Sequence, residues 1–137
     1  MNRVEKAAEY HKRGFNCAQA VSCAFADLIN VDEETLFKAT EGLGLGIGGM
    51  QGTCGAITGA AAVLGFLNST GDLNNPNSKA DTYKLSRQLV DEFYRKNGAI
   101  ICKELKGVET KKVLRSCPGC IDDAVEILEK IIAQRDA

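Results

Sequence analysis

The sequence lacks tryptophan, has a single histidine, and carries no excess of basic residues. Its 17 Lys and Arg nearly balance its 18 Asp and Glu, so the formal net charge is −1. A chain with this balance has no strongly basic surface of the kind that binds nucleic acid or anionic membranes. The one histidine, His11, closes a charged run, and we expect it to be solvated at the end of a helix rather than to activate a thiol.

Long hydrophobic runs are also missing. The N-terminus has no apolar segment typical of a signal peptide, and the longest strongly apolar stretch, residues 60–67, is too short to span a bilayer. We therefore expect a cytoplasmic protein. The 137 residues, of which 45% are hydrophobic and 26% charged, predict one globular domain over residues 1–137 with its own core.

Helical periodicity accounts for most of the chain, and no segment alternates like a strand. Asn16 with Gln19 forms a capping-box pattern, and Thr53 and Ser78 are further expected N-caps. The expected helices cover residues 2–13, 16–28, 32–38, 54–67, 79–97 and 118–133, with a short piece at 100–105. We predict an all-α fold, a single-domain bundle of five or six helices in which a glycine-rich loop leads into a central buried helix.

Ten of the fourteen glycines lie between Gly42 and Gly71, and residues 42–49 cannot form an ordinary helix or strand. Their spacing formally matches a dinucleotide fingerprint, but no strand precedes it. Two interpretations are better. The glycines allow tight backbone packing around Cys54, or they present amides to a thiolate, sulfide or anion. On the second interpretation the cofactor-binding residues would be Gly48, Gly49, Gly52 and Gly55.

Six cysteines are the main chemical signal of the chain. Without an export signal they indicate redox chemistry, metal or cluster binding, or burial as small hydrophobic residues. Cys54 opens the expected helix 54–67, where unpaired N–H groups and the helix dipole favour the thiolate. The thiolate is the form that attacks disulfides and binds metals, so Cys54 is the first candidate.

A second cysteine motif is Cys117-Pro118-Gly119-Cys120, at the start of the last expected helix. With Cys117 as N-cap, both sulfurs lie in the first turn. The motif alone fits a redox dithiol, a pair of metal ligands, or an incidental pair. No second C-x-x-C is present, so the zinc-ribbon and ferredoxin patterns are not met. Cys23 lies on a different face of its helix from Cys17 and is expected in the core.

Four segments of the chain resemble a small bacterial and archaeal family of redox-active proteins, named for a CGAxxG motif and four characteristic cysteines. The segment from Cys54 to Gly59 matches that motif letter for letter, and the other three segments surround Cys17, Cys102 and Cys117. The resemblance implies a redox role without naming a substrate or electron partner. It also implies a functional association with a transporter. Cys23 and Cys120 are additional to the family pattern.

Three hypotheses follow. In the first, Cys54 is an attacking thiolate and a second cysteine, best Cys117, resolves the mixed disulfide. In the second, Cys17, Cys54, Cys102 and Cys117 ligate a [2Fe–2S] or another metal centre. In the third, the chain is a helical module that forms a homodimer or another protein interface through the face with Gly55 and Gly59, and its cysteines are packing residues. The first two require the four cysteines to meet in space.

Overall fold

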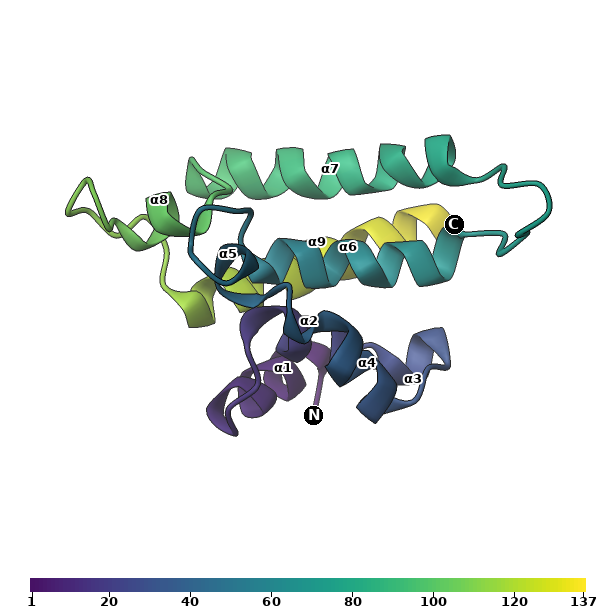
Figure 1. Ribbon diagram of the computed structural model, residues 1–137, viewed down its shortest axis with the longest axis horizontal. Coiled ribbons are helices and arrows are strands. Elements are labelled where there is room, and N and C mark those ends of the chain that lie inside the picture. The colour runs from purple at the N-terminus through teal and green to yellow at the C-terminus, as the bar shows by residue number, and fades with distance from the viewer.

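The computed structural model describes all 137 residues and contains nine helical segments and no strand (Figure 1). Six helices have seven residues or more: α1 (Arg3–Lys12), α2 (Cys17–Cys23), α4 (Glu33–Glu41), α6 (Gly55–Asn68), α7 (Lys79–Asn97) and α9 (Cys117–Asp136). Three are single turns: α3 (Ala26–Ile29), α5 (Gly44–Ile47) and α8 (Cys102–Lys106). The predicted all-α fold is confirmed. None of the helices is both long enough and apolar enough to cross a membrane.

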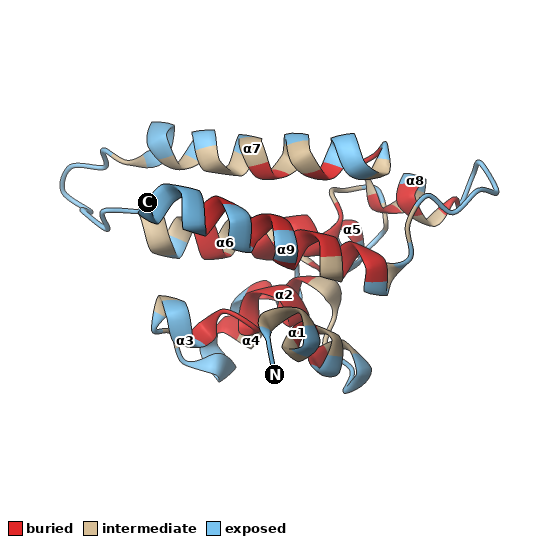
Figure 2. Ribbon diagram, turned by 180° about the vertical axis from the view of Figure 1, so that it is seen from behind, coloured by how far each residue is buried: buried red, intermediate tan, exposed pale blue.

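The helices form three layers (Figure 1). α7 lies on one side, α6 and α9 run through the middle, and α1 to α4 pack on the other side. Buried residues cover most of α6 and α9, whereas the outer face of α7 is exposed (Figure 2). α6 is the central buried helix that the sequence predicted, and α9 shares this position with it.

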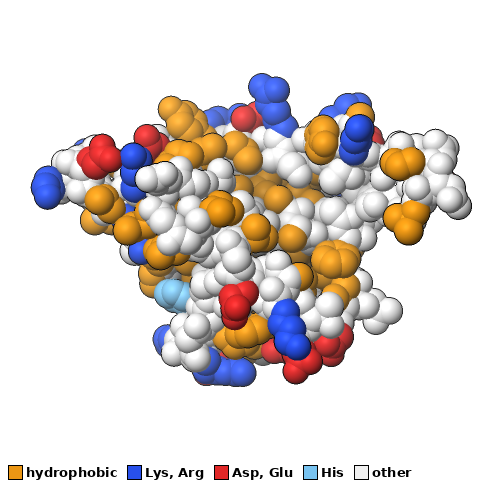
Figure 3. All heavy atoms as spheres, in the orientation of Figure 1, with side chains coloured by type: hydrophobic (Ala, Val, Ile, Leu, Met, Phe, Trp, Pro, Cys, Tyr) orange, Lys and Arg blue, Asp and Glu red, His pale blue; other side chains and the backbone are white.

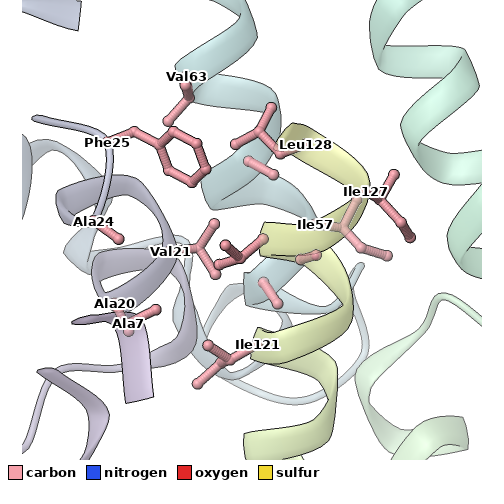
Figure 4. Packing of buried hydrophobic residues seen from close by; sticks show 14 of the residues in the cluster. Ala7, Ala20, Val21, Ala24, Phe25, Ile57, Val63, Ile121, Ile127 and Leu128 are labelled. Carbon is pink, nitrogen blue, oxygen red and sulfur yellow. The ribbon is translucent and has the colours of Figure 1, made fainter. Parts of the chain in front are cut away.

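The core lies where α2, α6 and α9 meet (Figure 4). Val21 of α2 and Phe25, which follows α2, face Ile57 of α6 and both Ile121 and Leu128 of α9. Each of these side chains is at most 2% exposed. Burying one aliphatic side chain of this size stabilises a fold by about 1.5–3 kcal/mol. The three helices are therefore fixed against one another by packing, and so are the ends from which they start.

α2 and α6 approach closely because α6 has glycines where it meets Ala18. A Cβ atom on Gly59 would lie 2.5 Å from the carbonyl oxygen of Ala18, and one on Gly55 would lie 3.3 Å from the Ala18 nitrogen. The Gly55–Gly59 face is thus used inside the chain, against α2. The interaction-module hypothesis relied on this face for an interface with another chain.

Three predicted boundaries differ from the structure. The helix predicted over residues 16–28 breaks at Phe25, whose backbone (φ −112°, ψ 7°) leaves the helix, and its ring enters the core. The N-cap of α6 is Cys54 rather than Thr53. The N-cap of α9 is Ser116, whose hydroxyl accepts a 3.1 Å hydrogen bond from the Gly119 N–H, so Cys117 is the first helical residue. Ser78 is the N-cap of α7, but its hydroxyl accepts from the Thr70 N–H instead of capping the helix.

The close approach of α2 and α6 gives a test of the fold. Gly59→Ala should destabilise the protein by about 2 kcal/mol, because the new methyl group meets backbone that cannot move aside. The matched control is Gly65→Ala on the same helix, where a Cβ has no neighbour within 4 Å. That change should stabilise the helix by about 0.5–1 kcal/mol. Urea denaturation of both variants measures the difference, and equal effects would contradict the packing described.

Candidate functional site

Cys17 is placed by the cap of α2. The Asn16 side chain accepts a 2.9 Å hydrogen bond from the Gln19 N–H, and the Gln19 side chain accepts one of 2.9 Å from the Asn16 N–H. The predicted capping box is therefore present. The Asn16 amide also donates to the Glu41 carbonyl at 2.9 Å, which ties the start of α2 to the end of α4. Cys17, as the first residue of α2, is held where the helix begins.

Cys54 and Cys102 are brought together by a short antiparallel pairing of two loop segments. Thr53 and Ile101 form an isolated bridge. The Cys54 N–H donates to the Ile100 carbonyl at 2.8 Å, and the Cys102 N–H donates to the Gly52 carbonyl at 3.0 Å. Both segments lead straight into helices, since Cys54 caps α6 and Cys102 opens α8. The start of α6 is thereby fixed beside the start of α8.

The glycine run forms a left-handed turn that fits against this pairing. Leu45, Gly46 and Ile47 all have positive φ values, of 53°, 57° and 60°. Such a conformation costs a non-glycine residue about 1–2 kcal/mol. At Gly46 a side chain has no room, because a Cβ would lie 2.6 Å from the Cβ of Cys102. Tight backbone packing is therefore what this glycine provides beside the cysteines.

A buried carboxylate on α9, that of Asp123, fixes the segment that carries Cys117 and Cys120. Asp123 is 1% exposed and accepts hydrogen bonds from Arg115 at 3.0 and 3.1 Å, from Lys96 at 2.7 Å and from Asn97 at 3.2 Å. Burial opposes its ionisation, but these hydrogen bonds outweigh burial and lower the pKa of Asp123. The carboxylate joins α9 to the end of α7 and to the segment that precedes Cys117.

A pocket of about 160 Å³ opens where these helix ends meet. It lies at the end of the molecule that carries α5, α8 and the start of α9 (Figure 1). Five cysteines line it: Cys17, Cys54, Cys102, Cys117 and Cys120. Three residues with basic side chains also line it: His11, Lys106 and Arg115. The other lining residues are neutral: Asn16, Leu45, Gly55 and Leu105. The structure thus brings all four cysteines of the family pattern to one pocket and adds Cys120.

The cysteines differ in burial. Cys54, Cys102 and Cys120 are buried, whereas Cys17 and Cys117 are half-buried. Cys23 lies outside the pocket in the core, as expected, and its thiol donates a weak 3.9 Å hydrogen bond to the Glu33 carbonyl. Of the glycines predicted to bind a cofactor, Gly55 lines the pocket. The other three, Gly48, Gly49 and Gly52, are not part of its wall.

The surroundings of Cys54 favour its thiolate. The neighbouring Cys120 thiol is the largest influence that favours the ionised form of Cys54, while the weak hydrogen bond that the Cys120 thiol donates, at 3.9 Å, goes to the Arg115 carbonyl. Burial opposes this, but the N–H groups of Ala56 and Ile57 at the start of α6 and the charge of Lys106 add to it. Together they lower the pKa of Cys54 to about 7. The amides that matter are those of the helix start, as the position of Cys54 predicted, and not those of the glycine loop.

The neighbouring thiols are shifted in the opposite direction. The neighbouring Cys54 and burial raise the pKa of Cys120, so Cys120 keeps its proton. Burial and the neighbouring Cys117 and Cys54 raise the pKa of Cys17 to about 12. Burial also raises the pKa of Cys102. Among these four thiols, Cys54 is therefore the one whose surroundings favour the thiolate, whereas those of Cys17, Cys102 and Cys120 favour the protonated form.

The residues of the pocket show no grouping suited to a single metal ion. No three Cys, His, Asp or Glu side chains are placed so that they could hold one metal ion, such as a zinc ion with its zinc–sulfur distance of about 2.3 Å. Ligation of one metal ion by Cys17, Cys54, Cys102 and Cys117 therefore has no support in this geometry, and their ligation of a [2Fe–2S] centre stays a prediction.

Two basic residues of the pocket escaped the sequence analysis. Lys106 lies four residues after Cys102 on α8, a spacing that places both on one face, and this signal was available. His11 lies in the last turn of α1, as expected, and is half-buried, and it also lines the pocket, which the sequence analysis did not predict. Tyr10 stacks on Phe15 at 4.6 Å and so folds the end of α1 back towards α2. Figure 3 shows the histidine side chain in pale blue at the surface, next to hydrophobic side chains.

Comparison with known families agrees with this arrangement of cysteines. Residues 15–131 match the family described as "Putative redox-active protein (C_GCAxxG_C_C)". The chain belongs to this family. The match spans all four family cysteines and α2 to most of α9. No curated protein and no solved structure matches the chain significantly.

The lowered pKa of Cys54 predicts how the rate of its reaction with thiol reagents depends on pH. The thiolate should be half formed near pH 7, fully formed well above it and lost as the pH falls through about 7, whereas an ordinary thiol titrates at about 8.5. The rate of alkylation of Cys54, followed by peptide mass spectrometry, should therefore reach half its maximum near pH 7. Cys120→Ala should move this midpoint upward, because the largest influence that favours the thiolate is removed. A midpoint for Cys54 equal to that of a free thiol would contradict the assignment.

The hydrogen bonds of the buried Asp123 carboxylate predict that it stabilises the part of the fold that holds the cysteine site. Asp123→Asn should lower the free energy of unfolding by about 2 kcal/mol, less than for a fully buried ion pair because Lys96 and Arg115 are 50% and 39% exposed. Since the folded pKa of Asp123 is lowered, its contribution is complete above the unfolded value of about 4 and is lost as the pH falls through the folded one. Asp122→Asn is the control, and a difference between the variants that does not shrink as the pH falls below about 4 would contradict this account.

Proposed function

We propose that the protein carries out thiol–disulfide exchange in this pocket, with Cys54 as the attacking thiolate and Cys120 as the resolving thiol. The observation that carries the proposal is that Cys54 and Cys120 are both buried in the wall of one pocket, and the lowered pKa of Cys54 beside the raised pKa of Cys120 supports it. A thiolate whose pKa lies near the ambient pH is close to the optimum for attack on a disulfide. Membership of a redox-active family agrees with this chemistry.

The exchange has two steps. The Cys54 thiolate attacks a substrate disulfide, a mixed disulfide forms, and one substrate sulfur leaves as a thiolate. That leaving group takes the proton of Cys120, and the Cys120 sulfur then attacks Cys54 and releases the second substrate thiolate. Two electrons pass to the substrate, and the protein keeps a Cys54–Cys120 disulfide. In a reducing cytoplasm, where we expect the protein to act, cellular thiols would return this disulfide to the dithiol.

Cys120 replaces Cys117 as the resolving residue in this proposal. The sequence favoured Cys117 because both it and Cys54 were expected at helix starts. Cys117 lines the pocket with Cys17 and Lys106, and it contributes to raising the pKa of both of these neighbours. Cys17 and Cys117 therefore form a second, half-buried pair closer to solvent. This pair is suited to passing reducing equivalents from an external thiol to the inner disulfide.

Disulfide mapping tests the proposal. Mild oxidation with bis(2-hydroxyethyl) disulfide should give a Cys54–Cys120 cross-link, detected by mass spectrometry without reduction. Cys120→Ser should instead accumulate the mixed disulfide at Cys54, because the resolving thiol is missing. Cys54→Ser should form neither, and Cys23→Ser, outside the pocket, should behave as the unchanged protein. A Cys54–Cys117 cross-link would reject the role of Cys120, and an unreactive Cys54 would reject the function.

A further inference from the structure

The pocket restricts what can reach Cys54. This side chain is 5% exposed and lines a pocket of about 160 Å³. An apolar cavity of similar size, about 150 Å³, holds a molecule such as benzene. A disulfide in a folded protein is carried by two backbone segments, which such a pocket cannot admit. The disulfide attacked by Cys54 must therefore belong to a small molecule.

Apart from the Cys54 thiolate, the charged residues that line the pocket are positive. They are Lys106 and Arg115, and no Asp or Glu is among the lining residues. Arg115 is already paired with Asp123. Lys106 takes part in none of the ion pairs between side chains. Burial alone would lower the pKa of Lys106, but its neighbours Cys117, Cys102 and Cys17 outweigh burial and raise this pKa, so Lys106 stays protonated.

The ends of two long helices add to this local positive potential. α6 has 14 residues and α9 has 20, and both begin at the pocket. A helix of this length carries a partial positive charge of about half a unit at its N-terminus. The chain as a whole has a formal net charge of −1, so the positive potential is a property of this pocket and not of the entire surface.

From the volume of the pocket, the burial of Cys54 and the positive side chains in the pocket wall, we infer that the substrate is a small anionic disulfide. It carries a carboxylate or a similar acidic group next to its sulfur atoms. Lys106 binds the acidic group while Cys54 attacks the adjacent sulfur. The first product leaves as a small anionic thiol, and the electron balance is that of the two-step exchange described above. This inference rests on the proposed function and gives it a substrate class.

Three small disulfides of different charge provide the test: dithiodiglycolate as the dianion, bis(2-hydroxyethyl) disulfide as the neutral probe and cystamine as the dication. The rate of Cys54–Cys120 cross-linking is measured for each and divided by its rate with a free small thiol, which removes differences between the leaving groups. The dianion should be favoured over the dication by about tenfold or more at low ionic strength. High salt should reduce this ratio. Insulin, as a protein disulfide, should be reduced far more slowly than the anionic probe.

Substitutions of Lys106 test its role in binding the acidic group of the substrate. Lys106→Met should lower the anion-to-cation ratio several-fold, and Lys106→Arg should largely preserve it. Lys103→Met is the matched control, because Lys103 lies on the same helix but outside the pocket. A normalised rate for cystamine equal to or above that for dithiodiglycolate in the unchanged protein would overturn the inference, as would reduction of insulin at the rate of the small probes. If the neutral probe still cross-links Cys54 to Cys120 in that case, the proposed function stands and the substrate class alone is rejected.

Discussion

Four helices of this protein begin at one pocket, and a cysteine stands at each beginning. Cys17, Cys102 and Cys117 are the first residues of α2, α8 and α9, and Cys54 is the N-cap of α6. The first turn of a helix has N–H groups without partners inside the helix. Bringing several such ends together concentrates unpaired donors and partial positive charge, which a thiolate can offset. The arrangement requires that the helix starts be held close to one another.

Several unusual features of the structure meet this requirement. The pairing of residues 52–54 with 100–102 joins the starts of α6 and α8. The left-handed turn at Leu45 to Ile47 packs a backbone against Cys102. The contact of Gly59 with Ala18 lets α6 approach α2, and Asp123 fixes the segment before α9 to the end of α7. Each of these features restricts the backbone or a side chain locally and thereby fixes the position of a cysteine.

The sequence predicts the parts of this arrangement that depend on neighbours in the chain. The helix periods, the capping box of Asn16 and Gln19 and the place of Cys54 at a helix start follow from local residue order. The proximity of Cys120 to Cys54 does not follow from local residue order. Cys120 was considered only as the neighbour of Cys117, because nothing local shows that α9 packs beside α6 with Cys120 and Cys54 in one pocket. The place of His11 in the pocket wall was missed for the same reason, since it depends on how the turn after α1 folds back.

The isolation of Cys23 has a consequence of its own. Its thiol is fully buried in the core between α2 and the start of α4 and shares no wall with the pocket. A thiol reagent reaches it only when that part of the core opens, whereas the pocket cysteines react from the folded state. The rate at which a thiol reagent labels Cys23 therefore reports the free energy of opening this part of the core. The same labelling experiment reports the reactivity of the pocket cysteines.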